Sequence, residues 1–381
     1  MNKYSTLEYD HVRIESCCFE ADGGIAEYHA TLHATRTNSS FVTQLDDLQN
    51  ACVRLLSCYG KHVRPVFKRY FLSDAANQAP LLAACDKDAI PCAVSIVQQP
   101  PLDGSKIALW VYLKPDTKIT AFPHGISDEH NGYRHIWTAG RIAAGNDSFR
   151  QTESLFQEYT AALKQMQCRL DTDCLRTWLF VQDIDRNYGG VVKARKAFFA
   201  QHQLTEQTHY IVSTGIEARH AVPETLVSLD AYAVRGLQPG QLRFLSAPTH
   251  LNPAHEYGVT FERGVCVEYG DRRHVFIAGT ASINNKGEIV HPDDITGQTL
   301  RMLENIEVLL AEAGTSFNHV VQMIVYLRDL SDYRVVNALF EARFPALPKV
   351  ITLAPVCRHA WLVETECIAI RQQHHPQFRA L

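Results

Sequence analysis

The chain repeats itself, and this internal repetition constrains its fold more than any other feature of the sequence. A shift of 255 residues places positions 45–74 on positions 300–329 without a gap. The residues shared in that shift are Leu45 and Leu300, Leu48 and Leu303, Asn50 and Asn305, Val53 and Val308, Leu55 and Leu310, Val66 and Val321, Leu72 and Leu327, and Asp74 and Asp329. A shift of 139 residues places Arg134-His135 on Arg273-His274 and Ala139-Gly140 on Ala278-Gly279. The chain therefore predicts three copies of one folding unit.

The third copy shows the order of elements most clearly. Residues 263–280 predict a β-hairpin, and Leu300, Leu303, Ile306 and Leu310 predict one apolar face of a helix. A strand over 319–329, a second helix over 335–344 and strands over 349–356 and 361–370 complete a β-β-α-β-α-β-β order. The predicted units are residues 1–118, 119–240 and 250–372, and the proline-containing segment 236–255 is the predicted linker.

Each such unit is an α+β fold with helices on one side of its sheet, so the other sheet face needs cover. Three units in one chain satisfy this need when their sheets face a common axis. The predicted architecture is an internal pseudo-trimer.

The composition describes a globular protein: 46% of the residues are hydrophobic, 20% are charged and the formal net charge is −4. This charge argues against a nucleic-acid partner, and an apolar stretch long enough to span a membrane is not seen. The N-terminal residues lack the apolar core of a secretion signal, so we expect a cytoplasmic protein.

Eleven cysteines are present without a C-x-x-C pair, and the histidines form no metal-binding motif such as H-E-x-x-H. We therefore expect reduced thiols, no metal and no cofactor.

The third copy resembles the RidA/YjgF/L-PSP family. The resemblance rests on FERGVCVEYGDRRHVFIAGTASINNKGEIVHPDDITGQTLRMLENI and AGTSFNHVVQMIVYLRDLSDYRVVNALFEARFP, together about a third of the chain. It implies the fold of bacillus-type chorismate mutase, a trimer and ligand sites in the clefts between units. Members include 2-imino and enamino acid deaminases and proteins labelled as endoribonucleases or translation initiation inhibitors.

The family's site positions fall here on Phe261, Gly279, Asn337, Lys349 and Glu364. Phe261 replaces a tyrosine and loses its hydroxyl. Lys349 replaces an arginine and loses the two-pronged grip on a carboxylate. Both differences count against a standard imino-acid deaminase.

The second and third copies together resemble the chorismatases, which release pyruvate from chorismate. The residues concerned are Arg176-Thr177-Trp178, Asp183-Ile184-Asp185, Tyr188, Arg195 and Ser213-Thr214-Gly215-Ile216. This resemblance makes Arg176 and Arg195 candidate ligands for the carboxylates of a substrate.

Glu364 is the predicted catalytic acid. The alternation of LVETECIAI places Glu364 and Glu366 on one face of a strand, where burial and mutual repulsion raise a carboxyl pKa. The repeats place Ser228 and Ile107 at the Glu364 position, so a single cleft keeps the acid. Cys357, just before this strand, is expected to line the pocket as a thiol rather than to act as a nucleophile.

Three functions follow as hypotheses. The first is a chorismatase-like hydrolase or lyase acting on a small carboxylate-bearing enol ether, because carbon protonation needs one placed carboxylic acid. The second is a RidA-type 2-imino or enamino acid deaminase, and the third is a ligand-binding or regulatory protein without turnover. An endoribonuclease role receives little support from the net charge.

Overall fold

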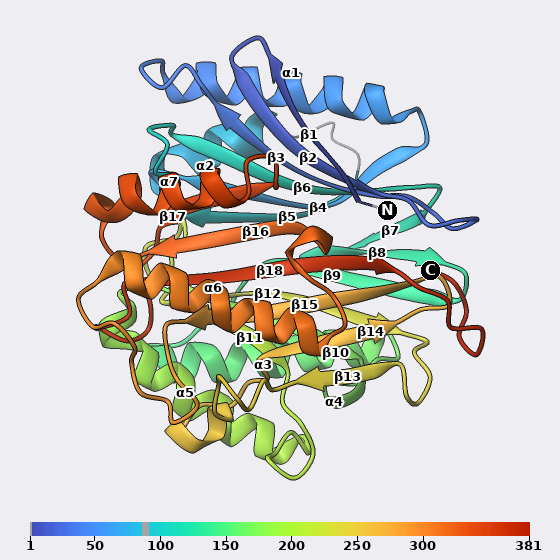
Figure 1. The fold of residues 1–381 in the computed structure, drawn as a ribbon, viewed down its shortest axis with the longest axis vertical. Helices are drawn as coiled ribbons and strands as arrows, with labels where there is room; N and C mark the ends of the chain where they lie inside the picture. The colour runs from blue at the N-terminus through green and yellow to red at the C-terminus, as the bar shows by residue number, and fades with distance from the viewer. Residues whose placement is uncertain (1, 86–90) are drawn as a thin grey trace.

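The computed structural model describes residues 2–85 and 91–381, and the strands of these residues form three six-stranded mixed sheets with helices between strands (Figure 1). The three sheets have the same order of strands: β1-β2-β3-β6-β4-β5, then β7-β8-β9-β12-β10-β11, then β13-β14-β15-β18-β16-β17. The identical order explains the repeated sequence pattern: each copy forms one sheet by the same path.

The bounds of the elements follow the three copies. The first copy contains β1 (Asn2–Tyr9), β2 (Val12–Phe19), β3 (Glu27–Ala34), α1 (Phe41–Tyr59), β4 (Val63–Leu72), α2 (Ala75–Cys85), β5 (Ala93–Gln98) and β6 (Ile107–Pro115). The second contains β7 (Lys118–Phe122), β8 (Gly125–His130), β9 (Tyr133–Ile142), α3 (Ser148–Gln165), α4 (Leu170–Asp173), β10 (Cys174–Val181), α5 (Ile184–Gln201), β11 (Val212–Glu217) and β12 (Val227–Arg235). The third contains β13 (Leu242–Leu245), β14 (Gly264–Glu268), β15 (Arg272–Ala281), α6 (Ile295–Glu312), β16 (Val320–Leu327), α7 (Tyr333–Arg343), β17 (Lys349–Leu353) and β18 (Val363–Gln372). Three short 3₁₀ helices, η1 (Ala254–Tyr257), η2 (Phe317–His319) and η3 (Leu330–Asp332), also lie in the third copy.

Two details of the third copy differ from the sequence prediction. The predicted linker 236–255 contains β13, which pairs with β14 and adds a strand before the predicted hairpin. Leu300 is 49% exposed, whereas Leu303, Ile306 and Leu310 are buried on α6. Leu300 therefore lies outside the stripe that packs on the sheet, although its spacing fits the helical period.

The three sheets share a central hydrophobic core. Trp110 of the first sheet, Trp178 of the second and Tyr326 of the third all belong to it. Each sheet also packs against its own helices through a separate cluster, as Leu45 and Leu109 do in the first copy. One face of each sheet thus meets the shared core, and the helices cover the outer face (Figure 1).

Isolated backbone bridges join the copies at corresponding strand ends. Gln98 bridges to Arg219, Ile216 to Val356 and Pro101 to Thr352. Each copy therefore contacts both others near the ends of β5, β11 and β17.

Nine of the cysteines are free thiols, namely Cys17, Cys18, Cys58, Cys85, Cys168, Cys174, Cys266, Cys357 and Cys367. Within residues 2–85 and 91–381, histidine, cysteine and acidic side chains form no group suited to a metal ion. No helix in this part of the chain is both long enough and apolar enough to cross a bilayer.

Candidate active site

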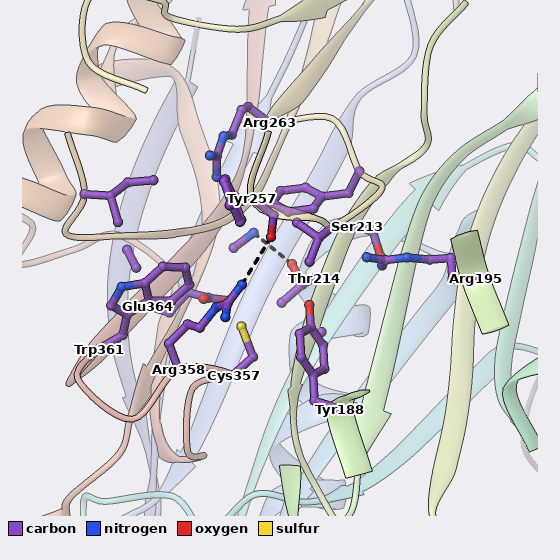
Figure 2. A pocket seen from close by; sticks show the side chains of 16 residues that line it. Tyr188, Arg195, Ser213, Thr214, Tyr257, Arg263, Cys357, Arg358, Trp361 and Glu364 are labelled. Atoms are coloured by element: carbon purple, nitrogen blue, oxygen red, sulfur yellow. Dashed lines mark hydrogen bonds between the residues drawn. The ribbon is translucent and has the colours of Figure 1, made fainter. Parts of the chain in front are cut away.

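A pocket lies between the second and third copies (Figure 2). The second copy contributes side chains from α5 and β11, and the third contributes β15, β18 and the segments that precede β14 and β18. The lining residues are Tyr188, Arg195, Ser213, Thr214, Gly215, Tyr257, Val259, Phe261, Arg263, Gly279, Ala281, Ile283, Cys357, Arg358, Trp361 and Glu364. Its free internal volume is about 30 Å³.

Glu364 is the acidic residue of this pocket. It lies on β18, opposite Ala281 of β15 and Tyr326 of β16, and is 4% exposed. Burial, and next the negative charge of Glu366, raise the pKa of Glu364 to about 8, although Arg176 and Arg263 oppose the shift. The carboxyl group is therefore mostly protonated at neutral pH and is suited to donate a proton.

Gly279 allows the Glu364 carboxyl group to lie directly against the β15 backbone. A Cβ atom at position 279 would overlap the Glu364 carboxyl oxygen and would lie 3.0 Å from Cγ2 of Thr214. A side chain at this position would therefore displace the Glu364 carboxyl group from its place in the site.

A buried hydrogen-bond network lies behind this wall of the pocket. Glu366 accepts hydrogen bonds from Arg176 Nη2 (2.7 Å), Trp178 Nε1 (2.6 Å) and Thr214 Oγ1 (2.6 Å). Thr214 Oγ1 in turn accepts the backbone N–H of Gly279 (2.9 Å). The network joins the second and third copies and holds a carboxylate near Glu364.

The cationic side chains of the pocket come from both copies. Arg195 donates to Thr260 Oγ1 (3.1 Å) and Ser213 Oγ (3.3 Å), and Arg263 donates to the Asn252 carbonyl oxygen (2.9 Å). Among the described residues, the buried atoms Arg195 Nη2 and Arg263 Nε have no hydrogen-bond partner. Both are donors without any acceptor capacity, so they suit an anionic ligand.

Cys357 lies beside these groups in the pocket. Burial and the nearby Glu364 raise the pKa of Cys357 to about 12, although Arg358 opposes the shift. The thiol is therefore protonated and a poor nucleophile.

The structure brings together Glu364, Gly279, Phe261, Arg195 and Cys357 from the predicted set. Arg176 and Glu366 do not line the pocket; they pair with each other behind it. This geometry does not favour a direct role of Arg176 or Glu366 in binding a substrate.

Lys349 and Asn337 lie away from this pocket. Lys349 Nζ bonds Glu15 of the first copy (3.3 Å) and Glu341 (3.0 Å), and Asn337 is half-buried on α7. The reason is the order of the sheet: β17 is the edge strand two places from β18, on the side away from β15. Lys349 therefore faces the first copy, not the second.

In the Glu364 pocket, the edge strand and the helix that correspond to β17 and α7 come from the second copy. Lys349 pairs with Met323, and the corresponding pair in the second copy is Ser213 with Thr177. The helix that corresponds to α7 is α5, which carries Arg195. The Glu364 pocket is thus built from central strands of the third copy and from an edge strand with its helix from the second.

Strand pairing also identifies the residues that replace Glu364 in the other copies. Glu364 lies opposite Tyr326, and the corresponding pairs are Ser228 with Phe180 and Ala108 with Phe71. Ser228 agrees with the sequence comparison, whereas the first copy has Ala108 rather than Ile107, one residue further along β6. Neither of these residues is acidic.

Several pocket residues were not among the predicted site residues. Tyr257 and Arg263 precede β14, and Arg358 and Trp361 lie in the loop before β18. These segments have no helical or strand periodicity, so their meeting could not be inferred from sequence patterns. The Arg358-His359 pair also occurs in the second copy, as Arg219-His220.

Comparisons with known proteins agree with this architecture. Residues 261–371 match the family described as endoribonuclease L-PSP. A RutC family protein of Pyrococcus abyssi is 39% identical over 101 residues, which are 26% of this chain and 79% of that protein. The 2-iminobutanoate/2-iminopropanoate deaminase of Escherichia coli is 29% identical over 104 residues, 26% of this chain and 80% of that enzyme.

A solved chorismatase structure shares the fold over a longer stretch. It superposes with a TM-score of 0.64 and 17% sequence identity, covering 80% of this chain and 92% of that one. The family model thus matches within the third copy and the sequence relatives cover about a quarter of the chain, whereas the structural likeness extends over most of it.

Proposed function

The chain belongs to the RidA/YjgF family, which includes the RutC and L-PSP proteins, and from this premise we propose that its pocket cleaves a small carboxylate-bearing enol ether. Glu364 is the proposed general acid. The observation that carries the proposal is a buried, protonated carboxyl group facing a cavity that is also lined by arginines.

The polar groups of the pocket favour an oxygen-rich anion as the ligand. Arg195 Nη2, Arg263 Nε and the Tyr257 hydroxyl are buried and lack partners among the described residues. Arginine N–H groups only donate hydrogen bonds, and a protonated Glu364 adds another donor. A carboxylate satisfies such groups, whereas a ligand that presents N–H donors does not.

The proposed reaction begins with proton transfer from the Glu364 carboxyl group to the terminal CH₂ carbon of the enol ether. The C=C electron pair forms the new C–H bond, and the positive charge resides on the oxocarbenium carbon and its ether oxygen. Water adds to that carbon and returns a proton to the Glu364 carboxylate. The hemiketal then collapses to an alcohol and a keto acid, so the sum is hydrolysis by one water.

The remaining side chains have binding roles in this scheme. Arg195 and Arg263 hold the substrate's carboxylates, and the Gly279 backbone lets Glu364 reach the reacting carbon. Glu366, fixed by Arg176, keeps a negative charge near Glu364 and so favours its protonated form.

Chorismate is the first substrate to test, because a chorismatase shares the fold over 80% of this chain. Purified protein is incubated with chorismate, and pyruvate is measured with lactate dehydrogenase and NADH. The proposal expects pyruvate release by the parent and its loss in Glu364→Gln. Equal rates for the two proteins would reject Glu364 as the acid.

Imine hydrolysis is the second candidate, favoured by the name of the Escherichia coli relative, a 2-iminobutanoate/2-iminopropanoate deaminase. Against it stand the missing hydroxyl at Phe261 and the engagement of Lys349 with Glu15 and Glu341. Ammonia release from 2-iminobutanoate generated in the assay distinguishes it. Ligand binding without turnover of either substrate would favour a binding or regulatory protein.

A further inference from the structure

Residues 253–261, here called the strap, separate the pocket from a second hollow. Tyr257, Val259 and Phe261 line the pocket, whereas His255, Gly258 and Thr260 line an outer groove of about 310 Å³. Val259 lines both hollows. The strap is therefore the thin wall between the candidate active site and the outer groove.

Tyr257 is the strap residue with an unused polar group. Its Oη atom is buried and has no hydrogen-bond partner within residues 2–85 and 91–381. The ring lies beside the Arg263 and Arg358 guanidinium groups, at 5.3 Å and 6.0 Å from its centre (Figure 2). Burial raises the pKa of Tyr257 although Arg263 opposes the shift, so the phenol keeps its proton and can donate it in a hydrogen bond.

A buried hydroxyl without a partner is costly, because its hydrogen bonds to water are lost and not replaced. A hydroxyl group of this kind at a cavity wall gains its missing hydrogen-bond partner when a ligand binds in the cavity. The neighbouring side chains narrow the chemistry: Arg263 and Arg358 both carry positive charge, so the atom that accepts from Tyr257 belongs to an anion.

We propose that Tyr257 is a substrate-binding residue that donates a hydrogen bond to a carboxylate oxygen of the ligand. The inference rests on the proposed function, in which this pocket receives a carboxylate-bearing molecule. Tyr257 thereby contributes a hydroxyl group from the strap to the binding of the ligand. Specificity for the anion then depends on a segment outside the sheets.

The same contact couples the ligand to the position of the strap. All three arginines that line the pocket already bond to the strap or the residue before it: Arg195 to Thr260 Oγ1 (3.1 Å), Arg263 to the Asn252 carbonyl (2.9 Å) and Arg358 to the Tyr257 carbonyl (3.5 Å). A carboxylate held by these arginines and by Tyr257 adds a further link across the pocket.

The pocket must also open to receive that ligand. The cavity volume of about 30 Å³ is far below the roughly 300–1,000 Å³ of a typical small-molecule site. Movement of the strap toward the outer groove would enlarge the pocket, and Gly258 has a φ of 86°, a conformation that glycine adopts without strain.

The test is calorimetric binding of benzene-1,3-dicarboxylate, an inert planar dianion, to the parent and to Tyr257→Phe. The substitution removes one hydroxyl and keeps the ring beside the arginines. We expect about ten-fold weaker binding, the usual effect of one lost hydrogen bond to a charged group. The matched control is Tyr210→Phe, which removes a hydroxyl from the outer groove and should bind as the parent does.

Amide hydrogen exchange provides the second measurement. The dicarboxylate should slow exchange across residues 254–260 in the parent and in Tyr210→Phe, and less so in Tyr257→Phe at equal saturation. A role of Tyr257 in folding alone would alter exchange without ligand and leave the ligand's effect unchanged.

Unchanged affinity in Tyr257→Phe would overturn the inference, as would a parent that does not bind the dicarboxylate. Weaker binding in Tyr257→Phe together with no pyruvate release from chorismate by the parent would reject the proposed reaction and uphold the role of Tyr257. The two failures are thus distinguishable.

Discussion

Arg176 of the second copy donates a 2.7 Å hydrogen bond to Glu366 of the third, and this buried ion pair lies directly behind the pocket that contains Glu364. Trp178 and Thr214 donate to the same carboxylate, so its position is fixed from three sides. The charge of Glu366 remains close to Glu364 and disfavours a second negative charge there. The contact between copies therefore adds to the effect of burial, which is the larger cause of the raised pKa of Glu364.

Replacing Glu364 by glutamine should abolish most of the turnover while leaving the fold intact. Glutamine keeps the shape of the side chain and its hydrogen bonds but has no carboxylic proton to donate. We expect kcat to fall by roughly 10²–10⁴-fold, the typical contribution of a general acid. Pyruvate release from chorismate measures the change, and circular dichroism with thermal unfolding controls for folding. Parental kcat in this variant would remove Glu364 from the mechanism.

The activity should decline as the pH rises through about 8. Glu364 acts in its protonated form, and its pKa is raised to about 8 by burial and by Glu366. The fraction of protonated enzyme is therefore high at neutral pH and falls ten-fold per pH unit well above the pKa. A profile of kcat/KM between pH 6 and pH 10 measures this decline, which is the alkaline limb of the profile. The stability of the substrate is controlled at each pH. An activity that increases across this range would indicate a base in place of an acid.

The strand that carries Glu364 was predictable because it combines two independent signals. Alternation in LVETECIAI set which face Glu364 occupies, and the other copies lacked an acid at that position. The repeated order of elements likewise predicted three similar sheets, since apolar periodicity depends on local geometry.

Lys349 was placed in the wrong cleft because sequence order does not say which neighbour an edge strand faces. The family pattern lists its site positions along one chain, but a cleft between units draws them from two. Tyr257 and Arg263 were not found because their segment has no regular period. Their meeting with Arg195 depends on the packing of copies far apart in sequence.

The stability of the parent should fall with rising pH relative to that of Glu364→Gln. The folded-state pKa of Glu364 is about 8, above the value of about 4.5 that applies to the unfolded chain. The folded state therefore binds more protons between these values, and the unfolding free energy falls as pH rises across this window. This stabilisation is complete below about pH 4.5 and is lost as the pH passes through 8.

Urea unfolding of both proteins at intervals from pH 5 to pH 9 measures the difference. The slope is limited to ~1.4 kcal/mol per pH unit for one group. Subtracting the Glu364→Gln curve removes the titration of all other residues common to both proteins. A pH-independent difference would show that Glu364 does not titrate abnormally.

Gly279→Ala should reduce activity because the new methyl group would overlap the Glu364 carboxyl group. The side chain must then turn away or the β15 backbone must shift, and a displacement of about 1 Å costs roughly 10²-fold in rate. Gly189→Ala is the matched control, since a Cβ atom there meets nothing within 4 Å. Equal activity in both variants would show that the close approach of Gly279 and Glu364 is not needed.

Glu366→Gln should move the alkaline limb of the pH profile to lower pH. The substitution removes the negative charge that raises the pKa of Glu364 and leaves Arg176, which lowers it, without its counterion. Both effects favour the ionised form of Glu364, so the pKa falls, and we expect a shift of about one pH unit or more. The amide oxygen of glutamine can still accept from Trp178 Nε1, which limits the rearrangement.

An unpaired buried Arg176 should cost about 3–5 kcal/mol of stability, so rates are measured below the onset of unfolding. Arg169 and Asp171 form an ion pair at the surface, and neither residue lines the pocket. The control Asp171→Asn therefore removes a carboxylate outside the pocket and should leave the alkaline limb where the parent has it. A limb that stays in place in Glu366→Gln, or moves to higher pH, would show that the ion pair behind the pocket does not govern Glu364.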